Sequence, residues 1–266
     1  MTYIYPVISR RAGGLSIGIN LNTNNACNWR CVYCQVPNLQ RGTAPAVNLE
    51  LLHDELLGFL TDLADGSYFE KAGVPAEYHQ IRDIAISGNG EATSAAGFAQ
   101  VVDIIGQVRS AAGIDDTVKT VLITNGSLVQ RQSVRAGIAY LSRLNGEIWF
   151  KLDAATHQEL KRLNGTHLSP GRVFSNLKLT ATLCMTWIQT CAFALDGAPA
   201  ADRAAYLDFI RRIVHERIPV AGVHLYGLAR PSMQEEAGRL SALPPECLQE
   251  FAEAIEHAGL RTRLSP

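Results

Sequence analysis

The residues whose types and spacing most directly indicate chemistry in this chain are three cysteines within eight positions, Cys27, Cys31 and Cys34. They are separated by three and then by two residues, and an aromatic residue, Tyr33, precedes the last of them. Three thiolates this close together can bind three corners of one metal cluster, whereas a mononuclear site would need a fourth ligand from elsewhere. The segment therefore predicts a metal centre with one position open to another molecule.

The alternatives to a cluster are a disulfide framework and a zinc site. Six cysteines in 266 residues, half of them in one short segment, favour a reducing compartment and metal binding over disulfide bonds. A zinc site would use Cys31 and Cys34 as one half, but the sequence has no second closely spaced cysteine pair and no histidine pair. We expect Cys184 and Cys191 to be small buried residues on opposite faces of one strand, and Cys247 to be incidental.

Composition and charge are those of an ordinary globular enzyme. Hydrophobic residues make up 47% of the chain and charged residues 18%, and the length is sufficient for a substantial core. The formal net charge of -1 gives no general attraction to nucleic acid or membranes, although it leaves room for a local basic patch. We find no signal peptide and no apolar run long enough to span a bilayer. We expect one cytoplasmic domain, 1–266, with its core at about 13–228 and a C-terminal helix and tail at 229–266.

The elements that must position the cysteines follow from hydrophobic periodicity. The strands are predicted at 15–21, 81–87, 118–124, 147–152, 186–195 and 220–228. The helices are predicted after an N-cap at Asn48 and at 94–112, 130–144, 156–163, 170–183, 200–217 and 245–258. Residues 66–80 are expected to form an irregular connection, and the chain is expected to end in a short extended tail.

Strands that alternate with helices through short connections predict a parallel sheet with crossover helices. Six such units are fewer than the eight of a complete barrel. We therefore expect an α/β fold, a partial (β/α)6 barrel of parallel strands with outer helices, and periodicity alone leaves an open doubly wound sheet as the alternative. In either fold the functional groups lie beyond the carboxyl ends of the strands.

Polar and glycine-rich segments follow the other predicted strands at that same edge. On the sixth strand His224 and Tyr226 are two apart and share a face, so they could position a substrate or donate hydrogen, or simply form a wall. Arg230 follows that strand and could bind an anionic substrate group, or belong to a covering loop. The remaining candidates are Gly88, Asn89, Gly90 and Glu91 after the second strand, Thr124, Asn125 and Ser127 after the third, and Lys151 and Asp153 at the end of the fourth.

The spacing of Cys27, Cys31 and Cys34, with an aromatic residue before the last, resembles the CxxxCxxC signature of radical S-adenosylmethionine (SAM) enzymes. This resemblance implies a [4Fe-4S] cluster on the three thiolates, with the remaining iron chelating the amino and carboxylate groups of SAM. It further implies reductive cleavage of SAM to methionine and a 5′-deoxyadenosyl radical, which abstracts hydrogen from a substrate. An electron donor of the flavodoxin or ferredoxin type is implied as a partner.

The segment Gly88-Asn89-Gly90-Glu91 resembles the family's Gly-Gly-Glu motif, with Asn89 in place of a glycine. The resemblance implies that this segment binds the methionyl amino group of SAM. Glycines let backbone groups approach a ligand closely, and a carboxylate suits an ammonium partner. By the same resemblance the other SAM contacts, to the ribose or carboxylate and to the rest of the pocket, are Thr124, Asn125, Ser127, Lys151 and Asp153. For Lys151 the alternative is a surface lysine at a strand end.

Four segments, Ser9-Arg10-Arg11, Gly88–Glu91, Leu122–Leu128 and Lys151–Ala155, together resemble the branch that contains the wyosine-type tRNA synthases. Those synthases carry three further upstream cysteines for a second cluster and use a lysine to engage pyruvate. Here no cysteine precedes Cys27 and no lysine precedes residue 71, so neither feature carries over. Two further hypotheses are an enzyme that installs a glycyl radical in a partner protein and a cluster-binding sensor or electron carrier. The substrate, whether an RNA base, a peptide or a small metabolite, stays open.

Overall fold

The computed structural model describes residues 1–9 and 14–265 and has a mixed α/β fold with a mostly parallel central sheet. The Arg10–Arg11 pair and the predicted start of the core at residue 13 lie outside the described residues. Only β1 and β2 pair in antiparallel fashion, and the other neighbours are parallel in the part of the sheet that is described. In spatial order the strands are β1 (Ile4–Ser9), β2 (Gly14–Ile19), β5 (Ile81–Ile86), β6 (Lys119–Thr124), β7 (Gly146–Lys151), β8 (Met185–Cys191), β11 (Val220–Tyr226) and β13 (Thr262–Ser265).

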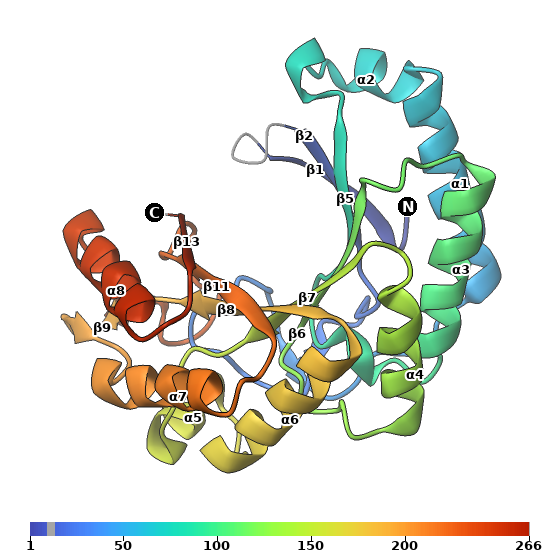
Figure 1. Ribbon diagram of the computed structural model, residues 1–266. Coiled ribbons are helices and arrows are strands. Elements are labelled where there is room, and N and C mark those ends of the chain that lie inside the picture. The colour runs from blue at the N-terminus through green and yellow to red at the C-terminus, as the bar shows by residue number, and fades with distance from the viewer. Residues whose placement is uncertain (10–13, 266) are drawn as a thin grey trace.

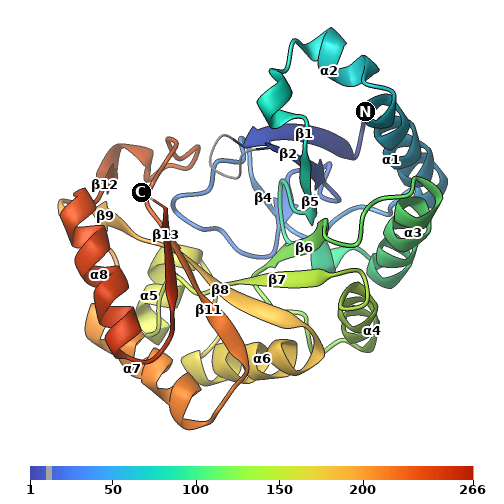
Figure 2. The same ribbon diagram turned by 45° about the horizontal axis from the view of Figure 1, so that its top comes forward.

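The sheet curves, and its two edge strands are β1 and β13, which do not pair with each other over the residues described. Helices lie along the outer side of the curve, and the C-terminus lies at the β13 edge (Figures 1 and 2). The six predicted strands are all present. The predicted tail supplies β13 as a further parallel strand, and β1 adds an antiparallel strand that the sequence analysis missed.

Several helices begin where the sequence supplies a cap. Asn48 accepts a hydrogen bond from the Leu51 amide at the start of the first helix, and Ser169 caps the helix that opens with Pro170. The expectation of an irregular segment at 66–80 is wrong in part, because it contains a short helix and a 3-10 turn at Ala76–Tyr78. The helices are α1 (Leu49–Ala64), α2 (Ser67–Ala72), α3 (Phe98–Ala111), α4 (Gln132–Leu141), α5 (His157–Asn164), α6 (Pro170–Leu183), α7 (Arg203–His215) and α8 (Pro245–His257).

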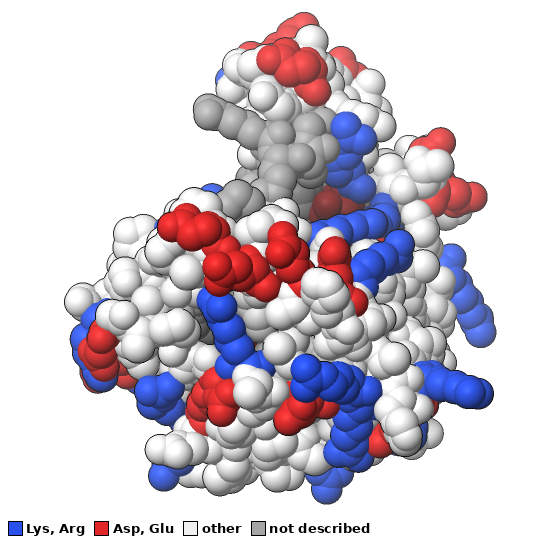
Figure 3. Space-filling model, turned by 60° about the vertical axis from the view of Figure 1, so that its left-hand side comes forward, with Lys and Arg blue, Asp and Glu red and all other residues white. Residues whose placement is uncertain are grey.

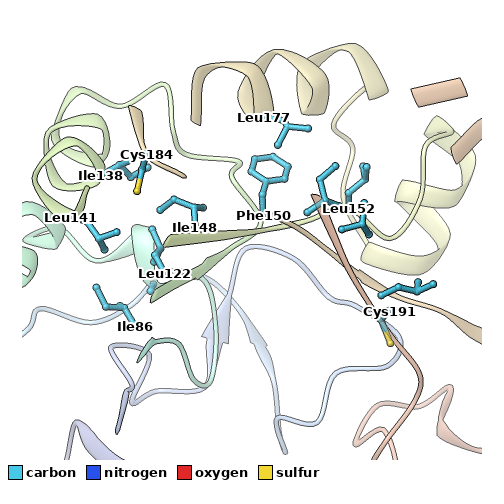
Figure 4. Close-up of a cluster of buried hydrophobic side chains, with 14 of the residues drawn as sticks. Ile86, Leu122, Ile138, Leu141, Ile148, Phe150, Leu152, Leu177, Cys184 and Cys191 are labelled. Atoms are coloured by element: carbon cyan, nitrogen blue, oxygen red, sulfur yellow. The ribbon is translucent and has the colours of Figure 1, made fainter. Parts of the chain in front are cut away.

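Alternation along the strands separates an apolar outer face from a more polar inner face. On β7, Ile148 and Phe150 are fully buried, whereas Trp149 and Lys151 point to the inner face and are partly exposed. Figure 4 shows the outer-face side chains of the central strands gathered beneath the helices. Burying each such large apolar side chain contributes about 1.5–3 kcal/mol, so the outer face makes a large contribution to the stability. The inner face carries the more polar side chains.

Two short ribbons complete the fold beside the main sheet. One joins β9 (Phe193–Leu195), β10 (Ala198–Pro199) and β12 (Leu240–Ala242), and the other pairs β3 (Ala26–Cys27) with β4 (Gln40–Arg41). Across the described ranges no helix has the length and apolarity needed to cross a membrane. On the face shown in Figure 3, basic and acidic side chains are interspersed, in keeping with the near-zero net charge.

Candidate active site

A cavity of about 370 Å³ lies beyond the carboxyl ends of the parallel strands, at the edge where the sequence analysis places the functional groups. It is lined by residues at the carboxyl ends of strands or in the segments that follow them, and the strands concerned are β2, β5, β6, β7, β8 and β11. Of the predicted site residues it is lined by Cys27, Cys31, Cys34, Gly88, Gly90, Glu91, Thr124, Asn125, Lys151 and Tyr226. It is also lined by residues that the sequence analysis did not assign to it, among them Tyr33, Gln189 and Cys191.

The loop that carries the three cysteines is fixed by backbone hydrogen bonds to the end of α5. The Arg30 amide donates to the Asn164 carbonyl (3.0 Å), and the Val32 amide donates to the Leu163 carbonyl (2.9 Å). Trp29 and Val32 are buried beside these contacts. These contacts anchor the loop to the end of α5.

A second set of contacts comes from the segment after β11, residues 229–236, which we call the clamp loop. The Ser232 hydroxyl donates to the Val32 carbonyl (2.7 Å), and the Met233 amide donates to the Cys34 carbonyl (2.9 Å). The Gln234 side-chain amide donates to the carbonyls of Cys34 (3.2 Å) and Val36 (3.0 Å). The clamp loop thus satisfies the backbone carbonyls of the cysteine loop.

The candidate Arg230 also lies in the clamp loop, but its side chain is exposed and does not line the cavity. The ion pair that ties the clamp loop to the cysteine loop uses different residues. Arg30 contacts Glu236 at 2.9 Å and Glu235 at 3.4 Å.

The sulfurs of Cys27 and Cys31 accept N–H hydrogen bonds. The Trp29 amide donates to Cys27 Sγ (3.5 Å), and the Asn164 side-chain amide donates to Cys31 Sγ (3.3 Å). Burial raises the pKa of Cys27 to about 11 and that of Cys31 to about 12, and it also raises the pKa of Cys34. Without a bound cation the thiols are protonated at neutral pH, so binding a metal must displace their protons.

The donor set fits a cluster. Over the described residues no group of three or more His, Cys, Asp or Glu side chains is arranged to hold one metal ion. A cubane cluster has a different requirement, because each thiolate binds its own iron atom. Three thiols on one cavity wall, two of them receiving N–H bonds, match that requirement, since hydrogen bonds to the sulfurs are a feature of protein-bound clusters.

Glu91 joins the segment after β5 to the segment after β6. One carboxylate oxygen accepts from the hydroxyls of Thr93 (2.5 Å) and Thr124 (2.6 Å), and the other accepts from the Asn125 amide (2.7 Å). The side chain is 3% exposed, and burial raises the pKa of this carboxyl. The carboxylate is therefore used mainly to fix the loop at Thr124 and Asn125, which the sequence analysis did not foresee.

The glycines of the same segment allow it to pack directly on the cysteine loop. A Cβ atom on Gly90 would lie 2.1 Å from the Ala26 carbonyl oxygen, and Gly88 has a φ of +132°. Asn89, which stands between them, does not line the cavity. Its side chain donates to Asn25 (2.7 Å) instead.

Asn28 connects the cysteine loop to the segment after β6. It donates to the Ser127 hydroxyl (2.7 Å) and accepts from the Asn125 side chain (2.9 Å). Ser127 is thus close to the site without lining the cavity. The asparagine within the cysteine loop was not identified from the sequence, although its place between Cys27 and Cys31 was a usable signal.

Lys151 and Asp153, two residues apart at the end of β7, have different surroundings. Lys151 lines the cavity and donates to the Tyr226 hydroxyl (3.0 Å), whereas Asp153 is buried behind it. Asp153 accepts from the Tyr33 hydroxyl, from the Cys191 amide (3.0 Å) and from Asn164 (2.9 Å). Through Asn164 this carboxylate is linked to Cys31, so it braces the cysteine loop.

His224 lies on the inner face of β11 but does not line the cavity. Its ring lies 4.5 Å from that of Trp187 and 4.9 Å from that of Trp149, centroid to centroid. His224 Nε2 is 3.8 Å from a carboxylate oxygen of Glu147. The histidine thus belongs to a polar cluster below the cavity, whereas Tyr226, two residues on, reaches the cavity itself.

Cys184 and Cys191 are both buried but occupy different places. Cys184 follows α6 directly and precedes β8, while Cys191 ends β8 and lines the cavity. Cys247 is partly exposed near the start of α8.

Comparison with known proteins gives a likeness of fold. No family model matches the sequence, and no curated protein matches it. Among solved structures, TYW1 with a lysine-pyruvate adduct bound has a TM-score of 0.61 at 15% identity, over 92% of this chain and 74% of that one. A radical SAM methyltransferase from Sphaerobacter thermophilus has a TM-score of 0.62 at 13% identity, over 100% and 77% of the two chains. HydG, a maturase of the [FeFe]-hydrogenase, has a TM-score of 0.60 at 10% identity, over 94% and 50%.

This chain shares its fold with TYW1, HydG and a radical SAM methyltransferase. At these identities the likeness concerns the fold alone.

Proposed function

We propose that this chain is a radical SAM enzyme that binds a [4Fe-4S] cluster through Cys27, Cys31 and Cys34. The observation that carries the proposal is the convergence of these three thiols with Gly90, Glu91 and Thr124 on one cavity. The cysteines and the glycine-rich segment are far apart in sequence, yet both meet at the carboxyl edge of the sheet. The shared fold with radical SAM proteins supports the same proposal.

The chain's own residues have three tasks in this proposal. The thiols hold the cluster, and the N–H bonds from Trp29 and Asn164 stabilise their anionic form. Gly88 and Gly90 line the cavity, and their backbone would receive the methionyl end of SAM, while their missing side chains let the segment pack closely on Asn20 and on the Ala26 carbonyl. Glu91 fixes the segment at Thr124 and Asn125, which would face the ribose or carboxylate of SAM.

When bound, the cluster supplies the electron that cleaves SAM into methionine and a 5′-deoxyadenosyl radical. The surrounding apolar side chains, among them Trp29, Leu39 and Leu228, limit the access of water to that region. A low-potential donor of the flavodoxin or ferredoxin type is part of the proposal. The proposal also includes the fold prediction of a partial barrel that forms one domain. The curved open sheet supports this prediction (Figure 2).

The wyosine-type alternative has one point in its favour, the likeness of fold to TYW1. That structure holds a lysine-pyruvate adduct. In this chain Lys151 is the one cation among the described residues that line the cavity. Burial alone would lower its pKa, but Asp153 beside it raises the pKa, so Lys151 is held as an ammonium and not as the neutral amine that an adduct requires. We therefore favour radical SAM chemistry without assigning pyruvate as the substrate.

The test is anaerobic reconstitution with iron and sulfide, followed by dithionite and SAM. We expect about four iron atoms per chain and formation of both methionine and 5′-deoxyadenosine. Replacing Cys27, Cys31 or Cys34 with alanine should abolish the cluster, whereas Cys247→Ala, in a residue outside the cavity, should not. Full iron content in any of the three single variants, or no 5′-deoxyadenosine from reconstituted wild-type protein, would refute the proposal.

A further inference from the structure

Three polar side chains line the cavity on the neighbouring strands β7, β8 and β11. Lys151 and Gln189 are register partners on β7 and β8, so their side chains lie next to each other on the inner face. The Tyr226 hydroxyl on β11 lies 3.0 Å from Lys151 Nζ. These strands lie on the far side of β6 from the segment that contains Glu91. The cavity therefore has a second polar region besides the one proposed for SAM.

The ammonium of Lys151 has hydrogen-bonding capacity left for a ligand. It has three N–H donors, and its one hydrogen bond within the described structure goes to Tyr226. Asp153 Oδ1 is 3.8 Å from Lys151 Nζ, which is longer than a hydrogen bond. The oxygens of Asp153 accept instead from Tyr33, Asn164 and the Cys191 amide. At least one ammonium donor is thus available at the cavity wall.

The two neighbours of Lys151 can donate in the same region. The side-chain amide of Gln189 lines the cavity and makes no hydrogen bond to other described residues. Tyr226 accepts from Lys151, which leaves its own hydrogen for the Cys191 sulfur or for a bound molecule. A cation, an amide and a hydroxyl on adjacent strands form a donor set that matches the two oxygens of a carboxylate.

Charge and shape point to the same ligand class. Burial alone would lower the pKa of Lys151, but Asp153 and the other acidic groups nearby raise it above its ordinary value, so the side chain stays a cation. Of the described residues lining the cavity, Lys151 and Glu91 are its two charged groups, and Glu91 is occupied by its own hydrogen bonds. Apolar side chains at Val36, Leu39 and Leu228 line the same cavity.

We propose that Lys151, Gln189 and Tyr226 form a subsite that binds the carboxylate of a small organic acid, with its apolar body against Leu39 and Leu228. The cavity of about 370 Å³ favours a small molecule over a polymer. The proposal deepens the proposed function by naming a substrate class, and it rests on that function only in calling the acid a substrate. It also assigns Lys151 to the substrate, whereas the sequence analysis grouped it with the SAM contacts.

The test measures binding of isovalerate and of its uncharged amide, isovaleramide, to the full-length metal-free chain by ligand line-broadening in NMR. Wild-type protein should bind the acid and discriminate against the amide. Lys151→Met should weaken isovalerate binding by about tenfold to hundredfold, because a charge-assisted hydrogen bond is lost. Lys161→Met, in an exposed lysine of α5, is the matched control and should bind as wild type does.

Two further variants serve in case Lys151→Met does not fold. Tyr226→Phe and Gln189→Leu remove one donor each and should weaken isovalerate binding by about threefold to tenfold. Equal binding of the acid and the amide, or unchanged isovalerate binding in Lys151→Met, would overturn the subsite. So would a loss of SAM binding in equilibrium dialysis of Lys151→Met with isovalerate binding intact, because Lys151 would then serve SAM.

The two proposals fail separately. If reconstituted wild-type protein forms no 5′-deoxyadenosine while the isovalerate results hold, radical SAM chemistry is refuted and the carboxylate subsite is supported. If 5′-deoxyadenosine forms and isovalerate shows no dependence on Lys151, the subsite is refuted and the chemistry stands.

Discussion

Glu147, below the cavity on the inner face of β7, is predicted to contribute a pH-dependent part of the stability. Burial alone would raise the pKa of Glu147, but the groups around it, His224, Lys119 and Trp149, lower the pKa to about 2 from an ordinary value of 4.5. The Lys119 ammonium lies 2.5 Å from its carboxylate and the Trp149 Nε1 lies 2.8 Å away, and the side chain is 2% exposed. A lowering of this size corresponds to about 3 kcal/mol of folding free energy at neutral pH.

The sign follows from the direction of the pKa change. Because the carboxyl of Glu147 has a lower pKa in the folded state, its contribution is fully present above the unfolded value of 4.5. It is lost as the pH falls from there toward about 2. At pH 3 we expect roughly 1.4 kcal/mol to remain, which is less than half of the neutral-pH contribution.

The experiment compares wild type with Glu147→Gln in urea denaturation followed by far-ultraviolet circular dichroism. At pH 7 the variant should be less stable by about 2–4 kcal/mol, and at pH 3 the difference should shrink by more than half. Glu77→Gln, which replaces an exposed glutamate, is the control and should leave the free energy of unfolding unchanged at both pH values. A difference for Glu147→Gln that is the same at pH 3 and pH 7 would show that the carboxylate charge is not the source of the stability.

Two substitutions test the contacts around the cysteine loop. Gly90→Ala should destabilise the fold by about 1–3 kcal/mol and lower the iron content after reconstitution, because its Cβ would lie 2.1 Å from the Ala26 carbonyl. Gly58→Ala, at a helical position open to solvent, should instead increase the free energy of unfolding by about 0.5–1 kcal/mol. Thermal melts of the two variants test both expectations. Ser232→Ala should lower the free energy of unfolding by about 1 kcal/mol, because the Val32 carbonyl loses a hydrogen-bond donor. It should also speed amide hydrogen exchange in the cysteine loop. Unchanged exchange there would contradict the role given to the clamp loop.

The parallel strands and their helices could be predicted because each has a clear local pattern. The strands β2, β5, β6, β7, β8 and β11 all match predicted segments, although β8 ends at Cys191 rather than at Leu195. β1 was missed because Pro6 interrupts its pattern, and a proline is tolerated there only because β1 is an edge strand. α2 depends on tertiary contacts, such as the stacking of Phe69 on His79, which have no local signal.

The candidate site was predictable where residue type alone fixes the chemistry, as for the three cysteines, and less so where neighbours decide. Glu91 was expected to meet an ammonium group, but its neighbours are hydroxyls and a backbone amide. Asn164 donates to Cys31 from the end of α5, more than a hundred residues away in the chain. Cys191 was treated as a buried apolar residue because the predicted strand continued past it, which concealed its place at the cavity wall. Such contacts depend on the packing of distant segments.

The clamp loop has a consequence for the order in which the protein matures. The hydroxyl of Ser232 reaches back to the carbonyl of Val32 across a separation of 200 residues. At synthesis rates of about 5–20 residues per second, the cysteine loop leaves the ribosome about 10–40 s before the segment that completes it. During that interval the cysteines have been synthesised but lack the contacts from the clamp loop, so their thiols are open to oxidation or to binding another metal. We therefore expect the proposed cluster to be inserted only after the clamp loop has been synthesised.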